Sequence, residues 1–182
     1  SIESRLRPLR YRHQLADHRL LEALDVEDGG AHHARFHRLH ARNLAQPLGE
    51  MLRRTLDVRD IQLFAILSGD VNPAHVDPEY AASSFFHEVI AHGMWGGALI
   101  STVLGTQFPG PGTIYIDQTL HFSRPVGLGD TITVTLTATR KFDHNHHILF
   151  DCVCTNQDGQ TVIRGTAEVL APTEKIKRAR IE

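Results

Sequence analysis

Asp70 and His75 lie five positions apart in a stretch whose residue types and spacing suit acid and base chemistry. Gly69, Asn72 and Pro73 in the same stretch are turn formers, and a residue that precedes proline is pushed out of the helical region. The sequence therefore predicts a tight loop here. A carboxylate and an imidazole on one loop can hold a water molecule between them and exchange protons with it.

The elements on either side of this loop direct it towards the start of a helix. Val58–Leu67 is predicted to be a helix that leads into the loop, and a second helix is predicted to begin at His92 and Gly93. The segment Met94–Leu104 is apolar almost all round, which in a helix indicates burial on nearly every side. The predicted arrangement places the acid and base groups close to the N-terminus of a buried helix.

The second half of the chain changes to a period of two, which is typical of strands. Around Thr131–Thr139, for example, aliphatic residues alternate with threonines, so that one face is expected in the core and the other partly in solvent. Strands are predicted at residues 49–56, 114–122, 131–139, 147–155 and 161–171. The last two are joined at Asp158-Gly159, a dipeptide that favours a hairpin turn.

These elements define an α+β fold. About five strands form a curled antiparallel sheet that wraps around the one buried helix, an architecture known as the hotdog fold. Gly96, Gly97 and Gly105 lower the helix propensity of that segment, so a close approach of the sheet to the helix is their expected use.

Four stretches carry a resemblance to a known family. Phe64–Asp77 (FAILSGDVNPAHVD) and Ile90–Met94 (IAHGM) resemble the signature of the MaoC-like dehydratases, the R-specific enoyl-CoA hydratases of the hydratase 2 type. The resemblance continues through Leu104–Tyr115 and His121–Val126, and it covers roughly Pro47–Thr173. It implies the same hotdog fold.

Two further stretches are similar to a particular group of bacterial fusion proteins. Ala91–Thr113 and Gly165–Lys175 resemble the hydratase-like N-terminal part of proteins that continue into a phosphate acyltransferase. The present chain ends at Glu182, so such an acyltransferase is expected only as a separate partner.

The resemblance implies an activity, namely the reversible hydration of a trans-2-enoyl thioester. Asp70 would abstract a proton from water, while His75 orients the water and supplies or relays a proton to the α carbon. The backbone N–H of Gly93 is the expected donor to the thioester oxygen, because helix N-termini carry unpaired N–H groups and a positive dipole end. No metal and no other cofactor is expected.

Five residues are predicted to bind or organise the substrate. Asn72 is expected to hold the Asp70 loop, Met94 and Trp95 to form the wall that sets acyl chain length, and Ser101 to lie near the substrate carbonyl. Arg124 is a candidate partner for a phosphate of coenzyme A or of an acyl carrier protein. Two of them have a structural alternative, which is a turn cap for Asn72 and core packing for Ser101. The assignment of Arg124 rests on its charge alone.

Composition excludes several classes. With 182 residues and a net charge of −2, the chain has a substantial core and no charge excess that would recruit nucleic acid or a membrane surface. No stretch is long enough to span a bilayer and no apolar leader opens the sequence, so a cytoplasmic protein is expected. Cys152 and Cys154 are expected to be reduced core residues, because no second cysteine pair completes a metal or redox site.

The chain divides into three predicted regions. Residues 1–45 are an Arg- and His-rich extension, helical or mobile, residues 46–173 are the hotdog domain, and residues 174–182 are a charged tail. Three histidines of the extension have helical spacing that could bind a metal, although a solvated Arg/His helix is the favoured alternative. They are His33, His37 and His40.

Partners and competing functions follow from the same features. An acyl-CoA or acyl carrier protein thioester is the expected substrate, and a homodimer or higher assembly is expected because a single hotdog domain leaves a sheet edge exposed. A thioesterase on the same fold and a non-catalytic module that binds acyl thioesters are the alternatives. The spacing of Asp70 and His75 favours the hydratase over both.

Overall fold

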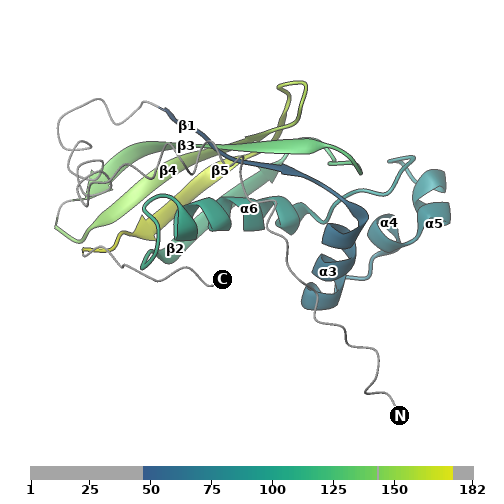
Figure 1. Ribbon diagram of the computed structural model, residues 1–182, viewed down its shortest axis with the longest axis horizontal. Helices are drawn as coiled ribbons and strands as arrows, with labels where there is room; N and C mark the ends of the chain where they lie inside the picture. The colour runs from purple at the N-terminus through teal and green to yellow at the C-terminus, as the bar shows by residue number, and fades with distance from the viewer. Residues whose placement is uncertain (1–46, 143, 174–182) are drawn as a thin grey trace, which may run out of the picture.

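The fold is a five-stranded antiparallel sheet in the order β1-β3-β4-β5-β2, which curls over the long helix α6 (Figure 1). The computed structural model describes residues 47–142 and 144–173. The predicted strands are confirmed with small changes at their ends. They are β1 (Pro47–Thr55), β2 (Ile114–Phe122), β3 (Thr131–Phe142), β4 (His147–Thr155) and β5 (Thr161–Leu170).

The period of two in β3 separates a core face from a partly exposed face. Ile132, Val134, Leu136 and Ala138 are all completely buried, and the threonines between them are half-buried. The strand β4 has the same alternation and pairs with β5 across the hairpin at residues 156–160, as predicted. Gly159 takes a positive φ of 74° in that turn, which glycine adopts without strain.

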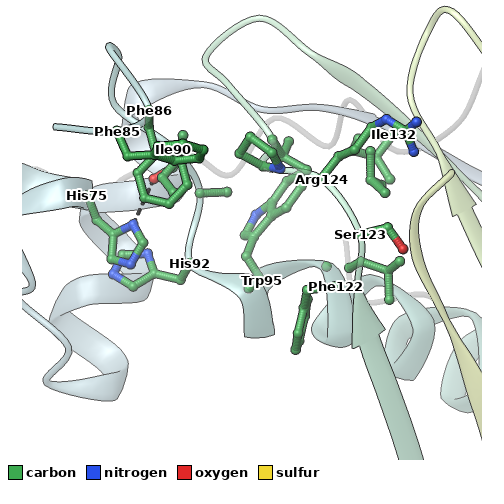
Figure 2. A pocket seen from close by; sticks show the side chains of 17 residues that line it. His75, Phe85, Phe86, Ile90, His92, Trp95, Phe122, Ser123, Arg124 and Ile132 are labelled. Atoms are coloured by element: carbon green, nitrogen blue, oxygen red, sulfur yellow. Dashed lines mark hydrogen bonds between the residues drawn. The ribbon is translucent and has the colours of Figure 1, made fainter. Parts of the chain in front are cut away.

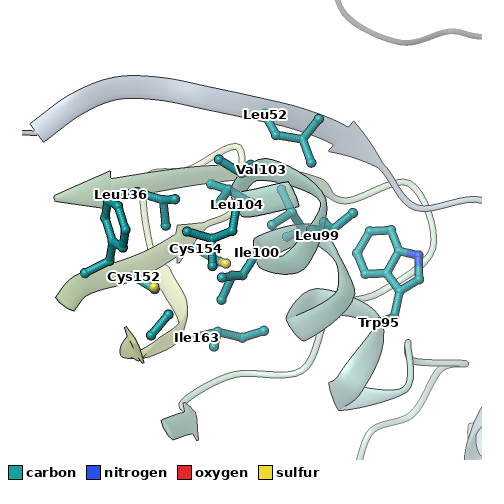
Figure 3. Packing of buried hydrophobic residues seen from close by; sticks show 14 of the residues in the cluster. Leu52, Trp95, Leu99, Ile100, Val103, Leu104, Leu136, Cys152, Cys154 and Ile163 are labelled. Carbon is teal, nitrogen blue, oxygen red and sulfur yellow. The ribbon is translucent and has the colours of Figure 1, made fainter. Parts of the chain in front are cut away.

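The helix α6 (Gly93–Thr106) forms the centre of the core. Ile100, Val103 and Leu104 are fully buried, and they face Leu136 and other apolar residues of the sheet (Figure 3). A Cβ atom at Gly96 would overlap Cδ1 of Ile163, so glycine at this position permits the close approach that the sequence predicts.

Two expectations about α6 were wrong. The space around Gly105 is open, so this glycine does not serve close packing. The helix is also not buried on every side, because Met94, Ala98 and Ser101 lie on an exposed face together with Gly105. Apolar composition alone did not indicate this face, since alanine and glycine tolerate both the core and the surface.

Three short helices precede α6 and carry the predicted loop. The helix α3 (Val58–Ser68) is capped by Asp57 and ends at Gly69, whose φ of 75° is left-handed. The structure then places His75 on α4 (Pro73–Val76), not on the loop itself, and α5 (Pro78–Ser83) follows. Both α4 and α5 begin with proline, which explains the difference, because the fixed φ of proline suits a helix start as well as a turn.

The predicted N-terminal extension and the charged C-terminal tail lie outside the described residues. The extension includes His33, His37 and His40, and the roles expected of both regions stay predictions. Within residues 47–173, leaving aside position 143, no helix combines the length and the hydropathy needed to cross a membrane.

Cys152 and Cys154 are free thiols on the core face of β4, as predicted. Burial raises the pKa of both thiols to about 12, with a smaller contribution to Cys152 from Cys154. The thiolate is the reactive form, so both cysteines are expected to stay unreactive in the folded protein below that pH. Labelling with a thiol reagent at pH 8 should give no modified protein until denaturant is added. Rapid labelling without denaturant would contradict the buried positions.

Candidate active site

Hydrogen bonds between side chains and the backbone shape the loop that carries Asp70. The Ser68 hydroxyl donates to the carbonyl of Phe64 at 2.6 Å and accepts from the N–H of Asp70 at 3.2 Å. The carboxylate of Asp70 in turn accepts from the N–H of Asn72 at 3.2 Å. Asp70 is therefore an exposed carboxylate whose position is set by the end of α3 and by its own turn.

Asn72 connects this loop to His75. Its side-chain oxygen accepts from the N–H of Ala74 at 3.1 Å and so caps α4. This contact is the turn cap given above as the structural alternative for Asn72, and a part in substrate binding stays a prediction. His75 is half-buried, and its Nδ1 lies 2.9 Å from the carbonyl oxygen of Ile90 (Figure 2). Since a carbonyl only accepts, Nδ1 carries the proton of that bond, and Nε2 is left to face the site.

His92 is the nearest neighbour of this pair, and the sequence assigned it no role. It is only 2% exposed, and its ring lies over that of His75 with the centroids 4.0 Å apart. Its Nε2 donates to the backbone carbonyl of Asp70 at 2.9 Å, while its Nδ1 is buried without a partner among the described residues. His92 thus links the start of α6 to the Asp70 loop.

Asp70, His75 and His92 form one cluster. One ligand atom of each residue lies within 4.8 Å of the other two. A carboxylate and two imidazole nitrogens are the donor types that hold a transition metal, and the same groups also bind and polarise a water molecule. Acid and base chemistry is what the cluster offers without any added group.

Gly93 places a helix N-terminus beside the cluster. As the first residue of α6 it has an N–H without an acceptor inside the helix, and the positive end of the helix dipole lies at the same point. A Cβ atom at this position would lie 3.0 Å from Cε1 of Phe122, so a larger residue would collide with that ring. Glycine keeps this N–H accessible to a ligand.

A cavity of about 410 Å³ opens next to these groups (Figure 2). His75 and His92 lie at one end of it, and Trp95 lies in the middle of the view with Phe122 beyond it. Gly93 also lines the cavity. Most of the lining is apolar, which suits a hydrocarbon chain better than a sugar or a nucleotide base. The remaining lining residues include Phe85, Phe86, Ile132, Val162 and Ile163.

The predicted site residues do not all meet at this cavity. Trp95 lines it, and Arg124 lies at its exposed rim, where the guanidinium donates to the carbonyl of Thr161 at 2.8 Å. Met94 and Ser101 are on the exposed face of α6 and are not among the lining residues. Substrate binding by these two residues remains a prediction, and this single chain brings neither of them to the cavity.

Several lining residues were not foreseen. Phe85 and Phe86 follow α5 in a segment without clear periodicity, and Phe122 ends β2 with its ring against Gly93. The one available signal was the position of Phe122 inside the His121–Val126 stretch, which resembles the family.

The fold and this cluster define a class, that of hotdog proteins with an Asp and a His beside a helix start. Residues 40–153 match the family model described as the MaoC like domain. The chain belongs to the MaoC-like dehydratase family.

Similar proteins agree in sequence and in structure. An (R)-specific enoyl-CoA hydratase of Rhodospirillum rubrum is 47% identical over 121 residues, which cover 66% of this chain and 83% of that protein. A 3-hydroxybutyryl-CoA dehydratase of Methylorubrum extorquens is 36% identical over 75% of this chain and 87% of its own length. The unliganded R-hydratase PhaJ1 of Pseudomonas aeruginosa superposes with a TM-score of 0.69 at 45% identity, over 76% of this chain and 88% of that one.

Proposed function

We propose that this protein catalyses the reversible hydration of trans-2-enoyl-CoA to (R)-3-hydroxyacyl-CoA. The observation that carries the proposal is the cluster of Asp70, His75 and His92, whose two histidines line the apolar cavity together with Gly93 at the start of α6. Asp70 itself is not among the lining residues, so the proposal requires that the bound water lies between Asp70 and the cavity. The names of the hydratase and dehydratase relatives support it.

A water molecule bound between Asp70 and His75 is the nucleophile in this mechanism. The Asp70 carboxylate takes one proton from the water as its oxygen bonds to the β carbon of the substrate. His75 takes part as an imidazolium. It delivers the proton on Nε2 to the α carbon and keeps the proton on Nδ1, which donates to the carbonyl of Ile90. One O–H bond of the water and the π bond of the enoyl group break while one C–O and one C–H bond form, and a proton passing from Asp70 to His75 restores both groups.

Negative charge that builds on the thioester oxygen needs a donor. The N–H of Gly93 meets this need, since it has no acceptor within α6 and Gly93 lines the same cavity as His75. The acyl chain would then extend along Trp95 and Phe122 into the apolar part of the cavity. Arg124 at the rim is available to a phosphate of the carrier group.

The test is incubation of the purified protein with trans-2-enoyl-CoA substrates of increasing chain length. Loss of the conjugated double bond without release of free thiol supports the hydratase. Release of free thiol would support a thioesterase on the same fold, and binding without either change would support a non-catalytic module. The assay should need no added metal or nucleotide.

Trp95 is expected to set the acyl chain length. It is 7% exposed and lines the cavity, so Trp95→Ala should enlarge the space for the chain and raise the ratio of long-chain to short-chain kcat/KM. This ratio is independent of how much enzyme is folded, which matters because the loss of a buried tryptophan costs about 3–5 kcal/mol of stability. Met94→Ala is the matched control, since Met94 lies outside the lining. If only Met94→Ala shifted this ratio, the acyl chain would have to lie along the other face of α6.

We infer further that the protein works as a homodimer through the edge strand β2. Among the described strands β2 pairs with β5 along one edge and with none along the other. Three of its apolar residues are about half exposed, from 48% to 55%: Ile114, Ile116 and Phe122. A long apolar edge strand is a template for pairing with a second chain. The acyltransferase partner and the cytoplasmic location remain predictions.

Two changes test this assembly and the domain boundary. Ile116→Lys should convert the dimer to a monomer, because a charge on each copy would oppose the other across the new edge. Deletion of residues 1–43 should leave both the dimer and the activity intact. Light scattering alongside the hydration assay measures both properties. A fully active monomer would contradict the dimer proposal, and an inactive truncated protein would contradict the boundary.

A further inference from the structure

We propose that His92 is a third member of the active site, with separate tasks for its two ring nitrogens. Its Nε2–H holds the Asp70 loop in place, and its buried Nδ1 accepts a hydrogen bond from the water that Asp70 and His75 bind. The proposal rests on the hydratase function proposed above. It assigns His92 a direct contact with the reacting water.

The donor task follows from the hydrogen bond at 2.9 Å between Nε2 of His92 and the carbonyl of Asp70. The carbonyl accepts, so the proton of the ring lies on Nε2 and Nδ1 carries a lone pair. Two residues earlier, Ile90 holds His75 in the same way through its own carbonyl. The short segment from Ile90 to His92 therefore orients both the base and the acid.

The acceptor task follows from the unpaired nitrogen. Nδ1 of His92 is buried and has no hydrogen-bond partner among the described residues, although buried polar atoms in folded proteins nearly always have one. No side chain packed around the ring donates to this nitrogen. Phe64 has no donor, the Nδ1 proton of His75 is used by Ile90, and the proposed mechanism uses the Nε2 proton of His75 for the substrate. A bound water supplies the missing donor.

The spacing of the cluster suits a water molecule. Two partners that each lie about 2.8 Å from a water oxygen are roughly 4.6 Å apart at a tetrahedral angle. One ligand atom each of Asp70, His75 and His92 lies within 4.8 Å of the other two, so a single water can reach all three side chains.

The proton count is also consistent. The water gives one proton to Asp70, as the mechanism requires, and its second O–H points to Nδ1 of His92 without being transferred. That second proton stays on the oxygen and becomes the hydroxyl proton of the 3-hydroxyacyl product. In the reverse direction Nδ1 accepts the same hydrogen bond from the substrate hydroxyl, so it orients the leaving group.

Three substitutions separate the two tasks. His92→Gln keeps an N–H close to the position of Nε2 but loses the acceptor, and His92→Asn keeps an oxygen close to the position of Nδ1 but loses the donor. His92→Phe keeps the ring and loses both. We expect kcat to fall about 10-fold in each of the first two variants and about 10²-fold in the third, with KM within about 2-fold of wild type. His144→Gln, at an exposed histidine after β3, is the control and should be unchanged.

A double-mutant cycle distinguishes this role from a structural one. In the Asp70→Asn background, His92→Phe should lower kcat by less than about 3-fold more, because the water it helps to hold is no longer activated. The proposal would be overturned if the double variant showed the product of the two single losses in kcat. It would also be overturned if His92→Phe kept the wild-type kcat, or if the unfolded fraction of that variant accounted for its whole loss of kcat.

A second measurement does not depend on activity. Imidazole ¹⁵N signals of the full-length protein should show His92 protonated on Nε2 and bare on Nδ1. A proton on Nδ1 would overturn the proposal, and so would tight binding of Zn²⁺ that Asp70→Asn and His92→Gln each abolish. If the wild type hydrates no enoyl thioester, the proposed function fails, and the ¹⁵N signals still decide the assignment of His92.

Discussion

Replacing Asp70 by asparagine is expected to lower kcat by about 10²- to 10⁴-fold, the usual range for the loss of a positioned acid or base. Asparagine keeps the size of the side chain and an oxygen that can accept the N–H of Asn72, which lies 3.2 Å from the carboxylate. What it loses is the negative charge that takes a proton from water. The initial rate of hydration and the thermal unfolding midpoint, measured on the same preparation, give the two quantities needed.

The matched control is Asp158→Asn in the exposed turn between β4 and β5, which should leave the rate unchanged. Asp70 is exposed, so Asp70→Asn should unfold within a few degrees of wild type. Near-wild-type turnover in Asp70→Asn would remove Asp70 from the mechanism.

Replacing His75 is expected to have an effect of the same size, about 10²- to 10⁴-fold on kcat. His75→Ala removes both ring nitrogens, whereas His75→Asn retains an amide N–H that can reach the carbonyl of Ile90, now bonded to Nδ1 at 2.9 Å. Because Nε2 is the nitrogen assigned to proton transfer, both variants should be equally slow. Substantial recovery in His75→Asn would mean that the contact with Ile90 matters and that Nε2 does not.

The double variant Asp70→Asn/His75→Ala gives a further check. Groups that act on one water as a unit lose their effect together, so the double variant should be little slower than either single variant. Independent multiplication of the two losses would indicate that the residues act in different steps.

Sequence patterns predicted the sheet well because its strands bury one face. In β3 the alternation of Ile132, Val134 and Leu136 with threonines leaves only one register that keeps the aliphatic residues out of water. The same reasoning was less informative for α6, where small residues such as Ala98 and Gly105 are compatible with both environments. The exposed face of that helix became visible only with the tertiary arrangement.

The candidate site was predictable where local chemistry dominates. Asp70, Asn72 and His75 lie within six residues, so their turn and cap geometry follow from local rules. His92 is different, because a lone histidine before an apolar helix has the same pattern as a core residue. Its role depends on the carbonyl of Asp70, 22 positions away in the sequence, and no local rule predicts that contact.

The central claim is that the protein adds water to one face of a trans-2-enoyl thioester, and the configuration of the product tests it most directly. The protein should be incubated with trans-2-enoyl-CoA, and the 3-hydroxyacyl product should be separated on a chiral column against both enantiomers. The account predicts (R)-3-hydroxyacyl-CoA alone, with no free thiol and with no product from Asp70→Asn on the same timescale. Formation of the S enantiomer, a mixture of both, or free coenzyme A in place of the hydroxyacyl thioester would contradict it.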